Sequence, residues 1–389
     1  MYKGRLILSQ ILDFVPRRKF NQCVTRYNGN YKVQTFSCRD QFIAMMFAQL
    51  TGRESLRDIE ACLRAMGKKL YHAGLRGDVS RSTLSDANKN RDCRIYEDFA
   101  HVLISRARKL YVNEDFGIEL EQTAYAIDAT TIDLCLSLFP WARFRKKKGG
   151  IKLHTLMELR GNIPCVIWVS DAKTHDVAFL DDIDYEPGSF YIMDKAYIDY
   201  ERLYRINHNQ AFFVTRAKTN IDYTRRAYRR VDKTTGLRSD QTIVLRGYYT
   251  SKNYPDGLRR ITFRDQDTKK RFTFLTNNFE LDALIIARLY KCRWQIELFF
   301  KWIKQHLRIK SFFGNTLNAV KTQIWIAISV YVLVAIIKRK LKIERSLYEM
   351  LQILSISLFE QMLIEQALTN IDLQNQNEAF RNQLLLFDL

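Results

Sequence analysis

The chain has 389 residues, a length typical of two or three domains, and 47% of them are hydrophobic, which excludes global disorder. Its 62 basic residues outnumber its 42 acidic ones and give a net charge of +20. This excess predicts a polyanionic partner, most economically nucleic acid. A protein that acts on anionic lipid or binds the ribosome would share the same charge.

Neither the cysteines nor the apolar segments indicate an exported or membrane protein. The seven cysteines are scattered without a C-x-x-C pair, a pattern typical of buried thiols in a reducing cytosol. Residues 1–20 lack the apolar run and cleavage site of a signal peptide. Residues 324–337 are apolar but fall short of the ~20 residues that span a bilayer. We therefore expect a soluble, cytoplasmic protein in which this segment is a buried helix.

Residues 1–118 have the apolar spacing of helices, and we expect them to form an N-terminal DNA-binding domain. Residues 38–52 and 54–67 read as two short helices, and residues 80–104 read as a polar, basic helix that opens with Ser and Thr capping candidates. That third segment carries Ser82, Thr83, Asn88, Lys89 and Arg91. The order resembles a helix-turn-helix arrangement, although a solvated helix in an ordinary bundle explains the pattern equally well.

The character of the chain changes near residue 119. Five short apolar or alternating runs, at 123–136, 150–159, 165–171, 189–197 and 211–218, read as strands, and a helix-like stretch at 198–209 separates the last two. Three strands in a meander followed by strand, helix and strand is the order of a ribonuclease-H-like α/β fold. We therefore assign residues 119–220 to the first part of such a core.

The rest of the chain is predicted as three further segments. Residues 221–278 are rich in Thr, Tyr and Arg and contain strand-like pieces at 241–249, 258–265 and 270–277, so we expect a β-rich insertion. Residues 279–340 read as the closing helices of the core. Residues 341–389 read as a helical C-terminal region whose Gln-rich spacing near 363–383 is typical of an amphipathic helix.

Two carboxylates stand at the ends of predicted strands. Asp128 follows the apolar run 125–127, and Asp194 follows the run 190–193. A carboxylate at the end of a buried strand is costly to desolvate unless it is paired, hydrogen-bonded or bound to metal. Taken singly, each is most simply a turn former. Two of them on neighbouring strands favour a site for a divalent cation, which prefers oxygen ligands.

Other acidic residues compete for that role. Asp133 lies five positions after Asp128, so a continuous strand would turn it to the opposite face. Asp171 ends the third predicted strand and stays a possible ligand, while His175 and Asp176 follow in the next turn and are expected to shape a loop. Asp181, Asp182 and Asp184 form an acidic run that we interpret as surface.

A helix is predicted over residues 289–312. At 100° per residue, Tyr290, Arg293, Glu297 and Lys304 project from one stripe about 60° wide, beside an apolar face. An ordinary solvated face with an Arg293–Glu297 ion pair would have the same geometry. The helix alone does not show whether Glu297 has a functional role or belongs to a solvated face.

The same residues fit the pattern Y-x2-R-x3-E-x6-K, which resembles the signature of the insertion sequence 4 family of bacterial DDE transposases. "AIDATTIDL" around Asp128 resembles the first acidic motif of that family, and "YIMDKAYIDYERL" around Asp194 resembles its second. The similarity extends to N-terminal stretches and covers most of the chain. The family also carries a β-rich insertion between the second Asp and the Glu.

The resemblance implies a catalytic triad of Asp128, Asp194 and Glu297 that binds two Mg²⁺, for which Mn²⁺ can substitute. Water would attack at the transposon end, and the freed 3′-hydroxyl would attack the opposite strand, giving a hairpin, or target DNA. Arg293 and Lys304 would bind phosphates, and Tyr290 would contact the DNA backbone or orient its neighbours. Joining two ends implies a homodimer on double-stranded DNA that carries the terminal inverted repeats.

Two basic stretches suit the same partner. Residues 143–148 ("RFRKKK") fall in the first predicted hairpin, and residues 225–230 ("RRAYRR") interleave an aromatic residue with arginines in the insertion. Both are also typical of a solvated surface. The DNA contacts we predict here are Arg143, Arg145, Lys146, Lys147, Lys148, Arg225, Arg226, Arg229 and Arg230. An aromatic residue within a basic stretch can stack on an extruded base. The sequence does not identify which aromatic residue does so, and Trp294 and Trp302 are as readily explained by packing.

Other functions fit parts of the pattern. A structure-selective nuclease with the same fold would cut DNA without joining it. A non-catalytic DNA-binding protein would bind DNA regardless of Asp128, and a basic structural protein would have no use for the carboxylates. An intact set of three acids favours the transposase.

Overall fold

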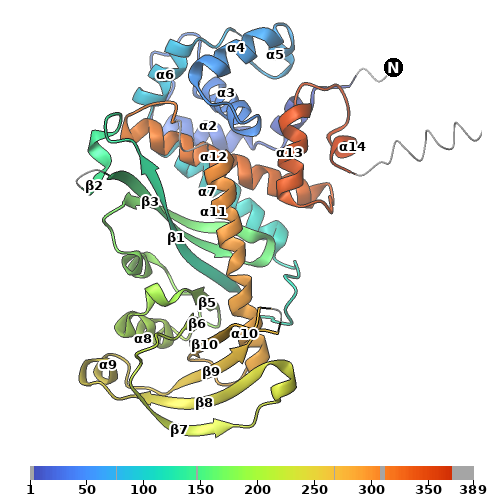
Figure 1. Cartoon of the computed structure of the whole chain (residues 1–389). Helices are drawn as coiled ribbons and strands as arrows, with labels where there is room; N and C mark the ends of the chain where they lie inside the picture. Colours follow the sequence, from blue (N-terminus) through green and yellow to red (C-terminus); the bar gives the residue numbers. More distant parts are fainter. Residues whose placement is uncertain (1–3, 76, 146–147, 267, 307–311, 370–389) are drawn as a thin grey trace, which may run out of the picture. The chain divides into compact units, whose positions relative to one another are not determined.

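The computed structural model describes residues 4–75, 77–145, 148–266, 268–306 and 312–369 (Figure 1). The chain forms two compact units, Met1–Leu103 together with Asn318–Leu389, and Ile104–Leu317. This division differs from the sequence-based one, which places all of residues 279–340 in the catalytic core. All seven cysteines lie in the described residues and are free thiols.

The first unit is built from helices. In chain order they are α1 (Ile7–Asp13), α2 (Arg17–Arg26), α3 (Cys38–Leu50), α4 (Leu56–Met66), α5 (Lys69–His72), α6 (Arg81–Asn90), the start of α7 (Arg94–Tyr111), α12 (Leu317–Lys340), α13 (Leu347–Ser357) and α14 (Ile364–Leu368). A capping box between Ser37 and Asp40 starts α3. The rings of Phe20, Phe42 and Phe99 pack edge to face in the core.

Helix α6 packs on α3 and α4, as a helix-turn-helix arrangement requires. The buried Asn88 accepts a hydrogen bond of 2.8 Å from Gln41 Nε2 on α3, and Arg91 donates to Gln41 Oε1 at 3.0 Å. These two side chains therefore hold the helix in place. Ser82, Thr83 and Lys89 are exposed. DNA binding by this unit stays a proposal.

Helix α12 is apolar on every side. It is long and apolar enough to cross a membrane, and 94% of its most apolar 18-residue window is buried inside the protein. Helices of the first unit help to cover it, with the ring of His101 lying 5.4 Å from that of Trp325. The prediction of a buried helix over residues 324–337 is confirmed. The predicted amphipathic helix near 363–383 is described only as far as α14, and the rest lies outside the described residues.

The second unit is built on one mixed β-sheet. Its strands are β1 (Ala124–Leu134), β2 (Arg143–Arg145), β3 (Lys148–Glu158), β4 (Ile163–Asp171), β5 (Phe190–Met193), β6 (Phe212–Arg216), β7 (Tyr223–Arg229), β8 (Leu237–Leu245), β9 (Leu258–Arg264) and β10 (Arg271–Thr276). The strand order among the described residues is β2-β3-β1-β5-β6-β10-β9-β8-β7, and β4 also pairs with β3.

Strands β1, β3 and β4 are antiparallel, whereas β1, β5 and β6 are parallel, with α8 (Tyr200–His208) between β5 and β6. This is the ribonuclease-H-like order expected from the sequence, so the predicted fold class is confirmed. The insertion strands β7 to β10 form an antiparallel meander, and β10 pairs with β6. The insertion therefore extends the same sheet.

The insertion strands differ from the prediction in two ways. The run predicted over 241–249 ends at Leu245, because the chain turns at Gly247 into the short helix α9 (Tyr248–Asn253). Strand β7 has no alternating apolar pattern, since residues 224–228 are all exposed, and it was not predicted. Its pairing with β8 forms it.

Helices cover both faces of the sheet. On one face, α8 and the 3-10 helix η3 (Asp176–Asp182) bury an apolar cluster that includes Ile127, Met193 and Phe213. On the other, α10 (Ala283–Cys292) packs on β5 and β6, and α11 (Trp294–His306) packs along β1 (Figure 1).

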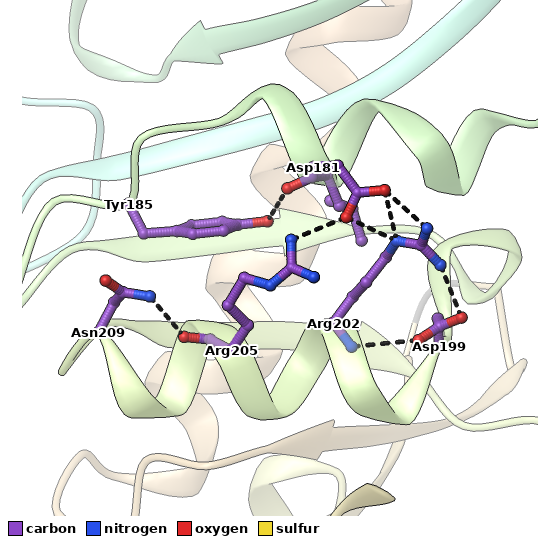
Figure 2. Close-up of polar contacts among 7 residues, drawn as sticks. Asp181, Tyr185, Asp199, Arg202, Arg205 and Asn209 are labelled. Carbon is purple, nitrogen blue, oxygen red and sulfur yellow. Dashed lines mark hydrogen bonds and ion pairs between the residues drawn. The ribbon is translucent and has the colours of Figure 1, made fainter.

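An ion-pair cluster joins η3 to α8 (Figure 2). Asp181 accepts hydrogen bonds from Arg202 Nη2 at 2.6 Å and from Arg205 Nη1 at 2.8 Å, and Asp199 caps the helix by accepting from the backbone of Arg202. The hydrogen bond from Arg202 holds the pKa of Asp181 below its usual value. The acidic run that the sequence assigns to the surface thus supplies a structural link through Asp181.

Candidate active site

Asp128 and Asp194 lie at the same level of two neighbouring parallel strands. Ile127 of β1 pairs in register with Met193 of β5, and each aspartate is the next residue. Because side chains alternate along a strand, Asp128 and Asp194 face away from the apolar cluster that contains Ile127 and Met193. They therefore point to the face that α10 and α11 cover.

Arg293 connects Asp128 to Glu297. Its Nη1 lies 2.8 Å from Asp128 Oδ2, and its Nη2 lies 2.5 Å from Glu297 Oε1. The three side chains are largely shielded from solvent, with exposed fractions of 15% for Arg293, 22% for Asp128 and 33% for Glu297. A guanidinium is a planar fork of donors, so it can bridge two carboxylates in this way.

Tyr290 binds the remaining acid. Its hydroxyl donates a hydrogen bond of 3.2 Å to Asp194 Oδ1, and its ring packs on Phe274 of β10 at 4.9 Å between centroids. The predicted single helix over 289–312 is divided at Arg293, where α10 ends and α11 begins. The turn remains close to helical, so Tyr290, Arg293 and Glu297 still face the sheet together.

The three carboxylates share one electrostatic environment. Burial raises the pKa of Asp128, and the positive charge of Arg293 and the backbone N–H of Ala129 oppose that rise. The negative charges of Glu297 and Asp194 raise it further. Both other acids therefore lie near enough to act on Asp128.

The chemistry of these donors suits a hard divalent cation, which takes carboxylate oxygens. Within the described ranges, no three His, Cys, Asp or Glu side chains are grouped closely enough to hold a metal ion. The cations and donors next to the acids are instead Arg293, on Asp128 and Glu297, and the Tyr290 hydroxyl, on Asp194. The acids are of the type that binds such an ion. In this structure some of their oxygens accept hydrogen bonds from Arg293 and Tyr290 instead.

The competing acids lie elsewhere. Asp133, further along β1, is exposed, as is Asp171 at the end of β4. Asp176 forms an ion pair of 2.9 Å with Lys152 of β3. Because β1 is continuous from Asp128 to Asp133, their odd spacing turns Asp133 to the opposite face, as the sequence predicts.

The predicted DNA-binding residues are spread over several elements. Lys304 is exposed on α11, Arg143 is exposed on β2, and Lys148 is exposed at the start of β3. Only the backbone of Arg145 is described, and Lys146 and Lys147 lie outside the described residues. Trp294 is 57% exposed next to Arg293, whereas Trp302 is buried.

The arginines of the insertion are not equivalent. Arg225 and Arg226 are exposed on β7, and Arg230 is exposed directly after it. Arg229 instead lies 3.5 Å from the buried carboxylate of Asp240. Arg229 therefore has a partner inside the protein.

Sequence reasoning missed Arg216, which lies at the level of Asp194 on the neighbouring strand. Thr215 of β6 pairs with Met193, so Arg216 follows at the level of Asp194. Its guanidinium lies over the ring of Phe272 at 5.3 Å, and no ion-pair partner for it occurs in the part of the chain that the structure describes. The available signal was a charged residue directly after a buried run, the same signal that identified Asp128.

Known protein families and individual proteins are similar to most of the chain. Residues 119–333 match the family described as "Transposase DDE domain", and residues 3–76 match a domain of unknown function (DUF4372). The chain is 34% identical over 283 residues to a protein of Sinorhizobium fredii named as transposase y4zB, an overlap of 71% of this chain and 77% of that one. It is 26% identical over 331 residues to a Synechocystis protein named as a transposase for insertion sequence element IS4SA, covering 82% and 88% of the two chains.

Two further similarities are weaker. A Geobacillus stearothermophilus protein named as a transposase for insertion sequence element IS5377 is 30% identical over 211 residues, which is 53% of this chain and 54% of that one. A solved piggyBac transposase synaptic complex with hairpin DNA has a TM-score of 0.43 and 9% identity, over 96% of this chain and 82% of that chain.

Proposed function

Because the chain belongs to the DDE transposases of the insertion sequence 4 family, which are phosphoryl-transfer enzymes, we propose that Asp128, Asp194 and Glu297 are the carboxylates with which it cuts and joins DNA. The observation that carries the proposal is the shared level of Asp128 and Asp194 on parallel strands, with Arg293 joining Asp128 to Glu297. All three acids thus belong to one cluster, although they are remote in sequence.

We propose that this cluster holds two Mg²⁺, or Mn²⁺ in their place. A pair of such ions, when bound, activates the attacking oxygen and stabilises the leaving oxygen of an in-line displacement at phosphorus. The protein's part is to hold the three carboxylates on rigid elements, the interior of β1, the end of β5 and one helix, and to shield them from bulk water.

The proposed reaction has two steps. In the first, a water oxygen bonds to the phosphorus at the transposon end, the P–O3′ bond breaks, and the 3′-oxygen leaves as a hydroxyl. In the second, that hydroxyl bonds to another phosphorus and displaces its 3′-oxygen. The second phosphorus lies in the opposite strand, which gives a hairpin, or in target DNA.

Phosphate contacts would fix the register of the DNA during both steps. We assign them to Lys304, to Tyr290 and Arg293 beside the acids, and to Arg225, Arg226 and Arg230 at the edge strand. We also assign them to the basic stretch Arg143, Arg145, Lys146, Lys147 and Lys148. Arg216 is added because its charge lies beside Asp194. We also propose that the helical first unit binds DNA and that two copies assemble on it, since joining two ends in one event requires two active sites.

A joining assay tests the proposal. The full chain is incubated with Mg²⁺, a linear duplex that carries the element end and a supercoiled plasmid, and the products are separated by size. We expect end cleavage and joined products from the wild type, and neither from Glu297→Gln. Cleavage without joining would indicate a nuclease, and absence of cleavage with both Mg²⁺ and Mn²⁺ would indicate a non-catalytic DNA-binding protein.

A further inference from the structure

Arg293 makes an unusual pair of contacts for a residue proposed to bind DNA. Both terminal nitrogens are engaged by catalytic carboxylates, at 2.8 Å to Asp128 and 2.5 Å to Glu297. Its side chain is only 15% exposed, and its buried Nε has no hydrogen-bond partner among the residues that the structure describes. In this arrangement one of the two N–H donors on each terminal nitrogen is bonded to a carboxylate, so the two acids together hold the guanidinium in place.

The oxygens that Arg293 occupies are those that a metal ion needs. Asp128 Oδ1 already accepts the backbone N–H of Ala129 at 2.8 Å, so Oδ2 is its more available oxygen, and that oxygen bonds Arg293. A divalent ion placed between Asp128 and Glu297 would also repel the guanidinium at close range. The guanidinium and the ion therefore compete for one position.

The remaining charge still favours a cation. By formal charge, three acids and one guanidinium leave an excess of two negative charges in the cluster, and in the described part of the chain the salt bridges of these acids are those to Arg293. A divalent ion would offset that excess completely. Once displaced, Arg293 would need a new anion, and a phosphate accepts the same bidentate geometry.

From these contacts we propose that Arg293 is an exchange residue: it bridges Asp128 and Glu297 in the free protein and transfers to a DNA phosphate when a divalent ion takes those carboxylates. The inference rests on the proposed function. Its consequence is linkage, because each ligand removes a cost from the binding of the other. Metal and DNA then tighten each other's binding by the same factor.

Mn²⁺ binding to the DNA-free full chain tests the first half of the inference. Free Mn²⁺ is measured by electron paramagnetic resonance for the wild type, Arg293→Ala, Arg293→Lys and Arg288→Ala. Arg288 is the matched control, because it is an exposed arginine on α10, five residues before Arg293. We expect Arg293→Ala to bind Mn²⁺ at least about fivefold more tightly than Arg288→Ala, within the range typical of coupled sites.

The lysine variant keeps the charge but cannot bridge two carboxylates with a fork, so we expect an intermediate Mn²⁺ affinity. It also keeps the test decisive if the alanine variant does not fold, which circular dichroism reports. Equal or weaker Mn²⁺ binding by the folded Arg293 variants, relative to Arg288→Ala, would show that Arg293 is a fixed structural ion pair and would overturn the inference.

The second half is tested with a pre-cleaved end duplex. In the wild type, we expect the duplex to tighten Mn²⁺ binding and Mn²⁺ to tighten duplex binding by one common factor. In Arg293→Ala, both factors should fall toward one. Loss of Mn²⁺ binding in Asp194→Asn shows separately that the acids bind metal, so failure of the exchange and failure of the proposed function give different results.

Discussion

Ile127 of β1 and Met193 of β5 are paired in parallel register, and that pairing sets Asp128 and Asp194 side by side. The two strands are distant in the chain, since β1 ends at Leu134 and β5 starts only at Phe190. The register of the two strands is nevertheless what brings the two acids to the same level. A shift of one residue would turn one acid into the apolar cluster on the other face.

The two strand acids should be essential for chemistry and not for folding. We expect Asp128→Asn and Asp194→Asn each to lower DNA cleavage at least about 100-fold, because a lost metal ligand removes several kcal/mol of transition-state stabilisation. DNA binding, measured by fluorescence anisotropy, should persist. Asp133→Asn is the control, since Asp133 is exposed on the same strand as Asp128. An equal loss of cleavage in the control would contradict the assignment.

The arginines of β7 should separate into two classes. We expect Arg225→Ala and Arg226→Ala each to reduce the slope of log K against log salt concentration for DNA binding by about one, as loss of one phosphate contact does. Arg229→Ala should change that slope little, because Arg229 is paired with Asp240. Anisotropy titrations at several salt concentrations measure the slopes. Three equal slopes would place all three arginines in one DNA-binding class.

The buried ion pair between β8 and β9 of the insertion should contribute to the stability of the protein. Arg259 and Asp240 are each 3% exposed and lie 2.7 Å apart. We expect Asp240→Ala to cost roughly 3–5 kcal/mol, because Arg259 would stay buried without its partner. Calorimetry should show a melting temperature lowered by roughly 10 °C. Asp256→Ala, which removes an exposed hydrogen bond to Asn207, should cost about 1 kcal/mol or less.

His154 should make stability fall in mild acid. Burial lowers the pKa of His154 to about 4, whereas the unfolded chain has the ordinary value of about 6.5. The unfolded state therefore binds more protons between these values, and the free energy of unfolding decreases as the pH falls from about 6.5 toward 4. We expect a loss of roughly 2 kcal/mol between pH 7 and pH 5 from this residue.

Urea unfolding at pH 7 and pH 5 measures that loss. In His154→Gln, the drop between the two pH values should be smaller than in the wild type by the same amount. Gln keeps a polar group near Ser170, whose hydroxyl lies 2.9 Å from His154 Nε2. An identical drop in both proteins would show that the protonation of His154 is not linked to unfolding.

Asp128 and Asp194 were predictable because their signals are local, although β1 continues through Asp128 to Leu134, so that only Asp194 follows the end of a strand. An acid directly after a buried apolar run indicates Asp128 and Asp194 without knowledge of the fold. The stripe of Tyr290, Arg293 and Glu297 was also visible, since helical spacing fixes which side chains share a face. What that stripe faces was not, because a helical projection contains no information about the strands against which the helix packs.

The remaining features depend on packing between distant segments. The stretch "RRAYRR" looks uniform, yet the irregular pairing of β7 with β8 near Arg226 and the buried carboxylate of Asp240 give Arg229 a different role from its neighbours. The apolar surface of α12 predicts burial but does not say which helices provide it. For that reason the sequence-based division kept residues 318–340 in the core, whereas the structure groups Asn318–Leu389 with the N-terminal helices.

Metal rescue of a thiolate tests the central claim most directly, because it reports ligation at one named side chain. In Asp194→Cys the carboxylate becomes a soft thiolate, a poor ligand for Mg²⁺ and a better one for Mn²⁺. We predict that this variant cleaves the element end at least about tenfold faster with Mn²⁺ than with Mg²⁺, beyond the ratio that the wild type shows, and that Asp194→Ala is inactive with both ions. Full activity of Asp194→Cys with Mg²⁺, or of Asp194→Ala with either ion, would show that Asp194 is not a metal ligand and would contradict the account.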